Sequence, residues 1–285
     1  MKCTKPVYLD SITKFPCGKC ENCETIRKME WGTRLKHELE TVGDGVFLTL
    51  TYNDEHLPYD GSISKDVIQR FFKRFRKLLF KEQMKKISYY SVGDYGELND
   101  RPHYHCIIFG IDKRNPVFEY VDFKKGYALC ESWTNGYVHV GTVTEASIHY
   151  VTGYVTRAVK FINSQMQKDS SRQLPFHLMS KGIGKDWCLL NSDQLTTNLS
   201  IVRQDVEVPI SRYYKTILEI PTNPDITNRL EKRQYLVKQA RYASLMSITN
   251  SPDELKLNTE EMRRAIQTQK NREAKEKLKK SKSMR

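Results

Sequence analysis

The stretch Arg101-Pro-His-Tyr-His-Cys-Ile-Ile-Phe109 determines how the rest of this 285-residue chain is interpreted. Its second half, Cys106–Phe109, is too apolar for a loop and too short for a helix, so the sequence predicts a β-strand. Side chains alternate along a strand, which places His103 and His105 on one face and Tyr104 on the other. Two imidazoles about 7 Å apart on one face can share a divalent ion. The alternative is a chance pair, with one histidine in the core and the other at the surface.

A second motif lies in Ser147–Phe161, where apolar and aromatic residues recur at three- and four-residue spacing. This spacing predicts a helix. Tyr150 and Tyr154 are then one turn apart on one face, and Arg157 continues the same row. Aromatic pairs at this spacing are common in cores. A tyrosine hydroxyl is also a usable nucleophile toward a phosphate that a metal ion polarises.

The composition favours an anionic polymer as the partner. The formal net charge is +13 and the isoelectric point is near 9.3, values typical of proteins that bind nucleic acid. No apolar signal segment and no membrane-length apolar run occur, which predicts a cytoplasmic protein. The P-loop motif is absent, because Gly182-Ile-Gly-Lys185 is followed by Asp186 where Ser or Thr is needed. We therefore expect no nucleotide-driven motor in the chain itself.

The cysteines divide into two groups. Four of the seven lie near the amino terminus: Cys3, Cys17, Cys20 and Cys23. This spacing predicts a tetrathiolate site for structural zinc, although an iron–sulfur cluster uses similar spacing and a set of reduced, unliganded thiols is the third possibility. The scattered Cys106, Cys130 and Cys188 are expected to be small buried apolar residues.

Periodicity predicts a mixture of helices and strands. We expect helices at 21–40, 64–83 and about 122–133, in addition to the tyrosine helix, and strands at 46–52, 87–92, 103–109 and 137–143. Ser64 should cap the second helix. The opposite side of that helix from its apolar stripe carries cations that either bind DNA phosphates or are merely solvated: Arg70, Lys73, Arg74 and Lys77. No regular βαβ period occurs, which favours an α+β fold with an antiparallel sheet.

Taken in order, these motifs resemble the HUH endonucleases that start rolling-circle replication, and more narrowly the replication initiation proteins of gokushoviruses, single-stranded DNA phages of the microvirus group. The resemblance covers most of residues 1–190. It rests on the cysteine cluster, Phe47–Asn53, Ser64–Lys77, Gly93–Gly96, Arg101–His105, Trp133–Gly141, Tyr150-x-x-x-Tyr154 and Met179–Gly184. It implies a central antiparallel sheet with flanking helices, the two histidines on a central strand and the tyrosine helix across the sheet.

The resemblance also implies three regions: a Cys-rich knuckle with the first helix (1–42), the nicking domain (43–190), and an accessory region with a basic helical tail (191–285). The implied chemistry is strand nicking with Mg²⁺ or Mn²⁺. A tyrosine oxygen attacks the scissile phosphate, which leaves a 5′-phosphotyrosine link and a free 3′-hydroxyl, and the displaced strand is later rejoined. In the family a lysine commonly follows the second tyrosine by three residues; here Arg157 stands there, and Lys160 lies one turn further on.

A metal held by two imidazoles usually takes an oxygen ligand as well. Asp94, at the end of the preceding strand, is the first candidate and Glu97 the second; many family members have Glu in the Asp94 position. The implied partners are viral origin DNA, single-stranded or supercoiled duplex, and a host helicase and polymerase, in the cytoplasm of a bacterial host. Two other functions fit the same residues: a metal-dependent hydrolase that uses water, and a non-catalytic basic DNA-binding protein.

Overall fold

The computed structural model of the chain describes residues 3–8, 14–83, 86–96, 99–154, 172–203 and 206–220, all within one compact unit, Met1–Ile220. The helices are α1 (Glu21–Val42), α2 (Lys65–Gln83), α4 (Lys185–Leu190), α5 (Ser192–Asn198), α6 (Arg212–Ile217) and a helix whose described part is 145–154. The strands are β1 (Val7–Tyr8), β2 (Lys14–Phe15), β3 (Gly45–Tyr52), β4 (Ser88–Tyr95), β5 (Pro102–Phe109), β6 (Glu119–Asp122), β7 (Tyr127–Cys130), β8 (Trp133–Thr142), β9 (Phe176–Met179), β10 (Ser200–Arg203) and β11 (Val206–Pro209). The accessory helices predicted beyond residue 220 lie outside the described residues.

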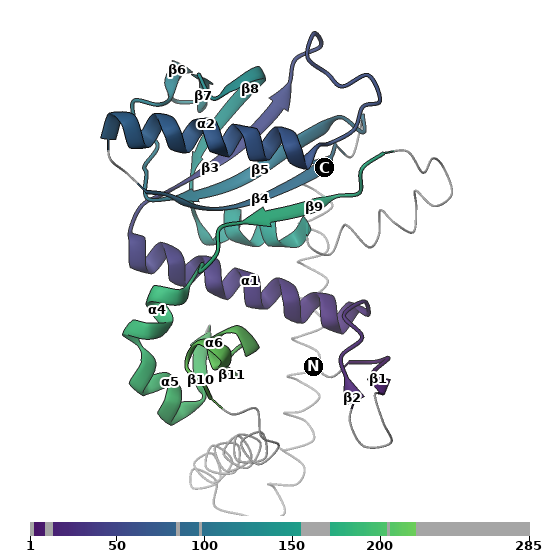
Figure 1. Cartoon of the computed structure of the whole chain (residues 1–285), viewed down its shortest axis with the longest axis vertical. Helices are drawn as coiled ribbons and strands as arrows, with labels where there is room; N and C mark the ends of the chain where they lie inside the picture. Colours follow the sequence, from purple (N-terminus) through teal and green to yellow (C-terminus); the bar gives the residue numbers. More distant parts are fainter. Residues whose placement is uncertain are drawn as a thin grey trace, which may run out of the picture. The chain divides into compact units, whose positions relative to one another are not determined.

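The centre of the fold is a seven-stranded sheet in the order β6-β7-β8-β3-β5-β4-β9, in which every pairing is antiparallel (Figure 1). The predicted α+β class with an antiparallel sheet is confirmed. The four predicted strands are present as β3, β4, β5 and β8. The strand that carries both histidines, β5, lies between β3 and β4 and is therefore central, with hydrogen-bonded neighbours on both edges.

The predicted helix at about 122–133 is wrong. This segment instead forms the hairpin of β6 and β7 and the start of β8. Exposure alternates residue by residue along β7, with Tyr127 and Leu129 exposed and the residue after each of them buried, and this period of two belongs to a strand. Gly126 begins the return strand with φ near +79°, and a Cβ there would lie 2.5 Å from the carbonyl oxygen of Val140. The close approach of this turn to β8 requires glycine.

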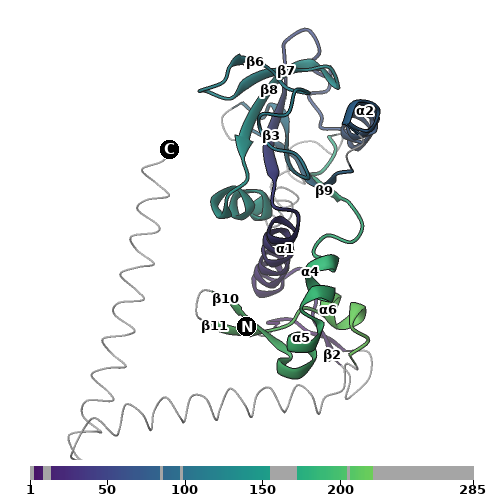
Figure 2. The ribbon, with the colours of Figure 1, turned by 90° about the vertical axis from the view of Figure 1, so that its left-hand side faces the viewer.

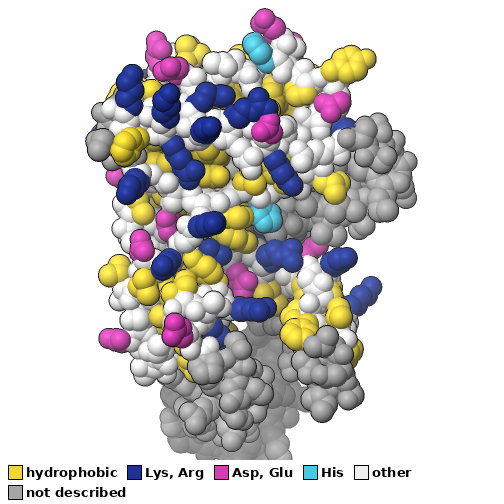
Figure 3. Space-filling model, viewed as in Figure 1, with side chains coloured by type: hydrophobic (Ala, Val, Ile, Leu, Met, Phe, Trp, Pro, Cys, Tyr) yellow, Lys and Arg dark blue, Asp and Glu magenta, His cyan; other side chains and the backbone are white. Residues whose placement is uncertain are grey.

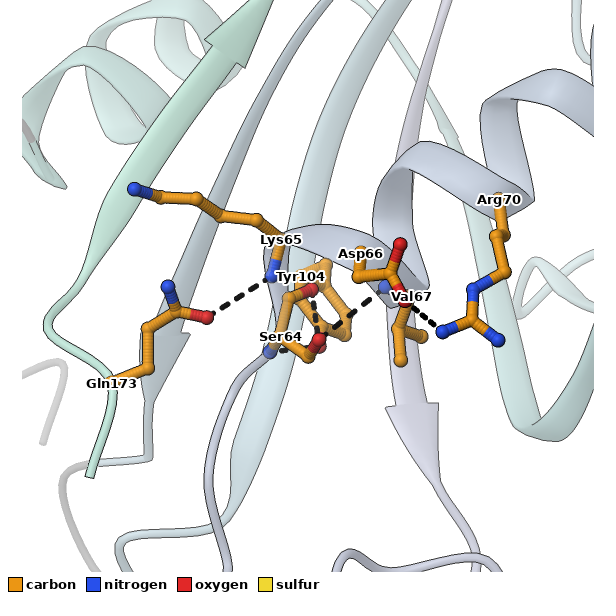
Figure 4. Close-up of polar contacts among 7 residues, drawn as sticks. All are labelled: Ser64, Lys65, Asp66, Val67, Arg70, Tyr104 and Gln173. Atoms are coloured by element: carbon orange, nitrogen blue, oxygen red, sulfur yellow. Dashed lines mark hydrogen bonds and ion pairs between the residues drawn. The ribbon is translucent and has the colours of Figure 1, made fainter. Parts of the chain in front are cut away.

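One face of the sheet is covered by α2. Phe71, Phe72 and Phe75 of that helix are fully buried against β-strand residues, and each buried aromatic side chain contributes about 1.5–3 kcal/mol. Ser64 caps the helix as predicted, because its Oγ accepts a hydrogen bond from the Val67 amide at 3.4 Å. The Ser64 amide donates to Tyr104 Oη at 2.8 Å, so a residue of β5 fixes the first turn of α2 (Figure 4).

The opposite face is covered by α1 and by the helix at 145–154. The apolar cluster on this face joins Leu35 of α1 to Ile148 and Val151 of that helix, across Tyr90 and Ile107 of the sheet. In the view of Figure 2, α2 and the helix at 145–154 lie on opposite sides of the sheet. The sheet therefore separates two chemically different surfaces, because alternate residues of every strand face different helices.

A smaller apolar cluster joins α4, α5 and α6 to α1. The His37 ring of α1 stacks on Trp187, with ring centroids 3.4 Å apart, and its Nδ1 lies 2.7 Å from Tyr214 Oη. Burial lowers the pKa of His37 to about 4, so the ring is neutral at physiological pH. Residues 185–217 thus pack on α1 within the same compact unit.

Candidate active site

The two predicted metal-binding histidines and Asp94 come together through strand register. Asp94 of β4 is directly opposite His103 of β5, and Val92 is opposite His105. Directly opposed residues of an antiparallel pair project from the same face, so Asp94, His103 and His105 all face the helix at 145–154. Asp94 and His105 are buried and His103 is half-buried.

Both histidines are held at Nδ1. His103 Nδ1 lies 3.1 Å from the carbonyl oxygen of Arg101. Because a carbonyl only accepts, this Nδ1 carries the proton and the Nε2 lone pair is available. His105 Nδ1 lies 3.1 Å from Thr49 Oγ1 on β3. A partner at one ring nitrogen is what orients a metal-binding imidazole and exposes its other nitrogen.

The tyrosines meet the histidine pair from the helix that covers this face of the sheet. Tyr150 Oη lies 3.3 Å from His105 Nε2, and Tyr154 Oη donates to Tyr150 Oη at 2.5 Å. Tyr150 is 47% exposed, whereas Tyr154 is 6% exposed and packs with the apolar cluster of this face. The predicted helical face is therefore present, and it directs both hydroxyls toward His105. The arrangement provides two oxygen nucleophiles of different accessibility beside one imidazole.

The donor atoms of the histidine site are not gathered as in a complete metal site. Within the described residues, the cysteine cluster is the only group of three or more His, Cys, Asp or Glu donors close enough to share an ion. Asp94 shares the face of the two histidines without joining them in such a group. The second candidate ligand, Glu97, and the predicted phosphate-binding Arg157 and Lys160 lie outside the described residues.

The four amino-terminal cysteines do converge. The sulfur atoms of Cys3, Cys17, Cys20 and Cys23 all lie within 4.8 Å of one another. Two of them accept backbone N–H groups, Cys3 from Cys17 at 3.3 Å and Cys17 from Cys20 at 3.3 Å. Hydrogen bonds from Thr4 lower the pKa of Cys20 to about 5. A thiolate is the form that binds metal, so this cluster, at the start of α1, could hold a metal ion.

The remaining three cysteines are buried as predicted, and the predicted DNA-binding cations lie on α2. That helix packs on the face opposite the histidines. Arg70 is paired with Asp66 (Figure 4), and Arg74 donates from Nε and Nη2 to the Ser132 carbonyl at 3.2 and 2.9 Å. Lys73 and Lys77 are exposed. Figure 3 shows Lys and Arg side chains gathered over α2.

Sequence reasoning missed Thr49. Its hydroxyl fixes the orientation of His105, and its position follows from the register in which Thr49 is directly opposite that histidine. The alternation Phe47-Leu-Thr-Leu-Thr-Tyr52 places Thr49 on one face of a strand. Only the pairing of β3 with β5 identifies the residue that it contacts.

Comparisons with known proteins agree on one family. The family model for replication-associated proteins of the ORF2 class matches residues 45–159, which run from β3 to beyond Tyr154. Replication-associated protein VP4 of Bdellovibrio phage phiMH2K is 32% identical over 219 residues, 70% of this chain and 66% of that protein. Replication-associated protein ORF4 of Chlamydia phage 1 is 28% identical over 245 residues, 82% of this chain and 60% of that protein.

A third relative, replication-associated protein ORF2 of Spiroplasma virus 4, is 28% identical over 198 residues, 66% of this chain and 61% of that protein. The chain thus spans 60–66% of the length of these relatives. No solved structure matches it significantly. None of the helices in the described part of the chain combines the length and apolar character of a membrane span.

Proposed function

Because the chain belongs to the replication-associated proteins of the gokushovirus and microvirus group of phages, we propose that it starts rolling-circle replication by nicking viral origin DNA. The proposed enzyme is an HUH-type endonuclease and strand transferase. The observation that carries this proposal is the contact between Tyr150 Oη and His105 Nε2, with His103 beside them on the same strand face. A hydroxyl nucleophile placed at a histidine pair is the arrangement that metal-assisted phosphoryl transfer to tyrosine requires.

The proposed reaction exchanges one phosphodiester for another. A tyrosine oxygen attacks the scissile phosphorus, the P–O3′ bond breaks, the tyrosine loses its proton and the departing 3′ oxygen gains one. A Mg²⁺ or Mn²⁺ ion bound by His103 and His105, with an oxygen of Asp94 or Glu97, would supply polarisation of the phosphate. Two neutral imidazole nitrogens and a carboxylate are a fitting donor set, with imidazole favouring Mn²⁺ over Mg²⁺.

The pair of tyrosines supports both halves of the cycle. The Tyr154 hydroxyl, which donates to Tyr150 Oη, would stabilise a Tyr150 phenolate, because hydrogen bonds to an ionised acceptor are the strong ones. Once one tyrosine is linked to DNA, the other can attack the regenerated origin and release the displaced strand. We assign Arg157 to holding a phosphate and Lys160 to protonating the departing oxygen, since arginine keeps its proton.

The hydrolase alternative would use water at the same histidines and leave no protein on the DNA. The exposed Tyr150 hydroxyl, which adjoins His105 Nε2, favours tyrosine over water as the nucleophile. A non-catalytic DNA-binding protein would give neither cleavage nor adduct.

The test is a denaturing gel of the protein mixed with end-labelled origin DNA and Mn²⁺. We expect a metal-dependent nick and a labelled band of low mobility that protease treatment removes. Cleavage without such a band would favour the hydrolase, and no metal-dependent cleavage of any origin strand would favour the binding protein.

The assignment of the third ligand makes a separate prediction. Asp94→Ala should move the Mn²⁺ concentration needed for half-maximal nicking upward by roughly 10-fold or more, since a lost carboxylate ligand weakens binding of the ion. The measurement is the nicking rate over a Mn²⁺ titration, with Glu97→Ala as the matched variant. A shift in Glu97→Ala alone would assign the ligand to Glu97.

For the cysteine cluster we propose one structural zinc. Its loss should destabilise the amino-terminal region by on the order of 10 kcal/mol, because metal binding in such sites is folding energy. Elemental analysis of the purified protein should give one zinc per chain, lost in Cys20→Ser and kept in Cys188→Ser, whose buried sulfur lies outside the cluster. Iron in place of zinc would mean an iron–sulfur cluster, and neither metal would refute the site.

The cations of α2 are proposed to bind DNA phosphates at a distance from the cleaved bond, because the sheet lies between α2 and the histidines. The proposed organisation keeps residues 1–42 as the metal knuckle with the first helix, 43–190 as the nicking domain and 191–285 as the accessory region. In the bacterial host cytoplasm, a host helicase and polymerase would extend the 3′-hydroxyl.

A further inference from the structure

The end of the sheet formed by β7 and β8 exposes large apolar side chains on one face. Tyr127 and Leu129 of β7 are 52% and 55% exposed, and Tyr137 of β8 is 66% exposed. Their neighbours along the same strands, including Ala128 and Val138, are buried in the core beneath α2. The exposed set therefore belongs to the face opposite α2. We call Tyr127, Leu129 and Tyr137 the aromatic surface; grouped exposed apolar residues of this kind mark interaction sites.

Strand register connects the aromatic surface to the histidine site. Tyr137 is directly opposite Thr51, and Thr51 is directly opposite His103. Opposed residues share a face, so Tyr137 and His103 project from the same side of the sheet. Two strand spacings separate them, about 10 Å. The intervening Thr51 is small, and the floor between the aromatic surface and the histidines is therefore low.

A second row runs parallel to the first. Tyr127 is opposite His139 of β8, with ring centroids 5.7 Å apart. His139 is in turn opposite Thr49, the residue that orients His105. The same face thus carries aromatic rings at its β7–β8 end and the proposed nucleophile at its β5 end.

The position of Tyr137 is fixed by the backbone. Gly136 has φ of +153°, and a Cβ on it would lie 2.3 Å from the Asn53 amide nitrogen. Only glycine allows β8 to begin this close to the end of β3. The following residue, Tyr137, is therefore held directly beside Thr51, and its exposed ring is placed by the sheet rather than by a loop.

We infer that the aromatic surface stacks unpaired bases of the single-stranded DNA that leads into the proposed nicking site. This inference rests on the proposed function and names the path of its substrate. Stacking requires a free base face, which single strands present and a duplex does not. Exposed Lys124 and Lys125, in the turn between β6 and β7 beside Tyr127, supply cations for the backbone of such a strand. An apolar protein partner would not need them.

The experiment measures binding separately from cleavage. Full-length protein carrying Tyr150→Phe and Tyr154→Phe is titrated, without divalent ions, into fluorescein-labelled oligothymidylate, and fluorescence anisotropy gives the dissociation constant. Tyr127→Ala and Tyr137→Ala should each weaken binding roughly 5- to 100-fold, the loss expected for one stacked base. Tyr137→Phe keeps the ring and should bind like its parent. Thermal melting should be unchanged, since the replaced rings are exposed.

Phe80→Ala is the matched control. Phe80 is 51% exposed and has cationic neighbours in Arg76 and Lys77, but it lies on α2, which covers the other face of the sheet. Its replacement should leave binding unchanged. Unchanged binding in both tyrosine-to-alanine variants, or a loss confined to Phe80→Ala, would overturn the inference.

A second measurement locates the bases directly. Oligothymidylate containing 5-iodouracil, cross-linked by light and mapped by mass spectrometry, should attach to Tyr127 or Tyr137; attachment confined to α2 would overturn the inference. The outcome is independent of nicking. If the wild-type protein fails to form an adduct while the tyrosine variants lose binding, the proposed function is wrong and the aromatic surface stands. The reverse result refutes the aromatic surface alone.

Discussion

Replacing Tyr150 and Tyr154 together by phenylalanine is expected to eliminate the covalent protein–DNA adduct. Both rings keep their packing, Tyr154 in the apolar cluster and Tyr150 against Phe47, while both candidate nucleophiles are lost. The double variant should fold and bind origin DNA. The measurement is retention of labelled DNA at a phenol interface before and after protease treatment. A protease-sensitive adduct from the double variant would place the nucleophile elsewhere in the chain.

The single variants, Tyr150→Phe and Tyr154→Phe, divide the cycle. Because the two hydroxyls are 2.5 Å apart beside one imidazole, each can replace the other in a first cleavage. Completion of cleavage and rejoining needs one free hydroxyl beside an occupied one. We therefore expect the single variants to nick but to release few closed circles. Closed circles at normal yield would refute the alternation and leave a one-tyrosine enzyme.

The second large effect is expected at the histidines. His103→Ala and His105→Ala should each abolish Mn²⁺-dependent nicking, a loss of at least about 1,000-fold, since polarisation of phosphate by the ion is worth several kcal/mol. DNA binding should persist. His56→Ala is the control, because this exposed histidine is bonded to Asn53 in a loop. Nicking at the wild-type rate in either site variant would refute the metal-site assignment.

The chain predicts its central strands well because their alternation is strong. The Arg101–Phe109 stretch alternates polar and aromatic side chains and then becomes continuously apolar, and β5 is central and buried. The segment at 122–133 misleads because its acidic and aromatic residues also fit helical spacing. The close passage of Gly126 against Val140 is a tertiary constraint that local spacing does not contain.

The site itself is only partly predictable. Alternation along one strand separates His103 and His105 from Tyr104, but sequence alone does not say which helix covers which face. The charge pattern of α2 therefore predicts a cationic surface without revealing that β5 turns its histidines away from it. Likewise, the opposition of Asp94 to His103 and of Thr49 to His105 depends on register, which is set by the pairing of strands distant in sequence.

The hydrogen bond between the two tyrosine hydroxyls has a consequence for timing. A phenolate at one position is stabilised by the O–H of the other, whereas two adjacent phenolates would lose that bond and repel each other. The pair can therefore release only one reactive oxygen at a time. When the first oxygen becomes esterified to DNA, the second is no longer committed to stabilising its charge. The order of the two strand transfers would then be kept by the protein without any external clock.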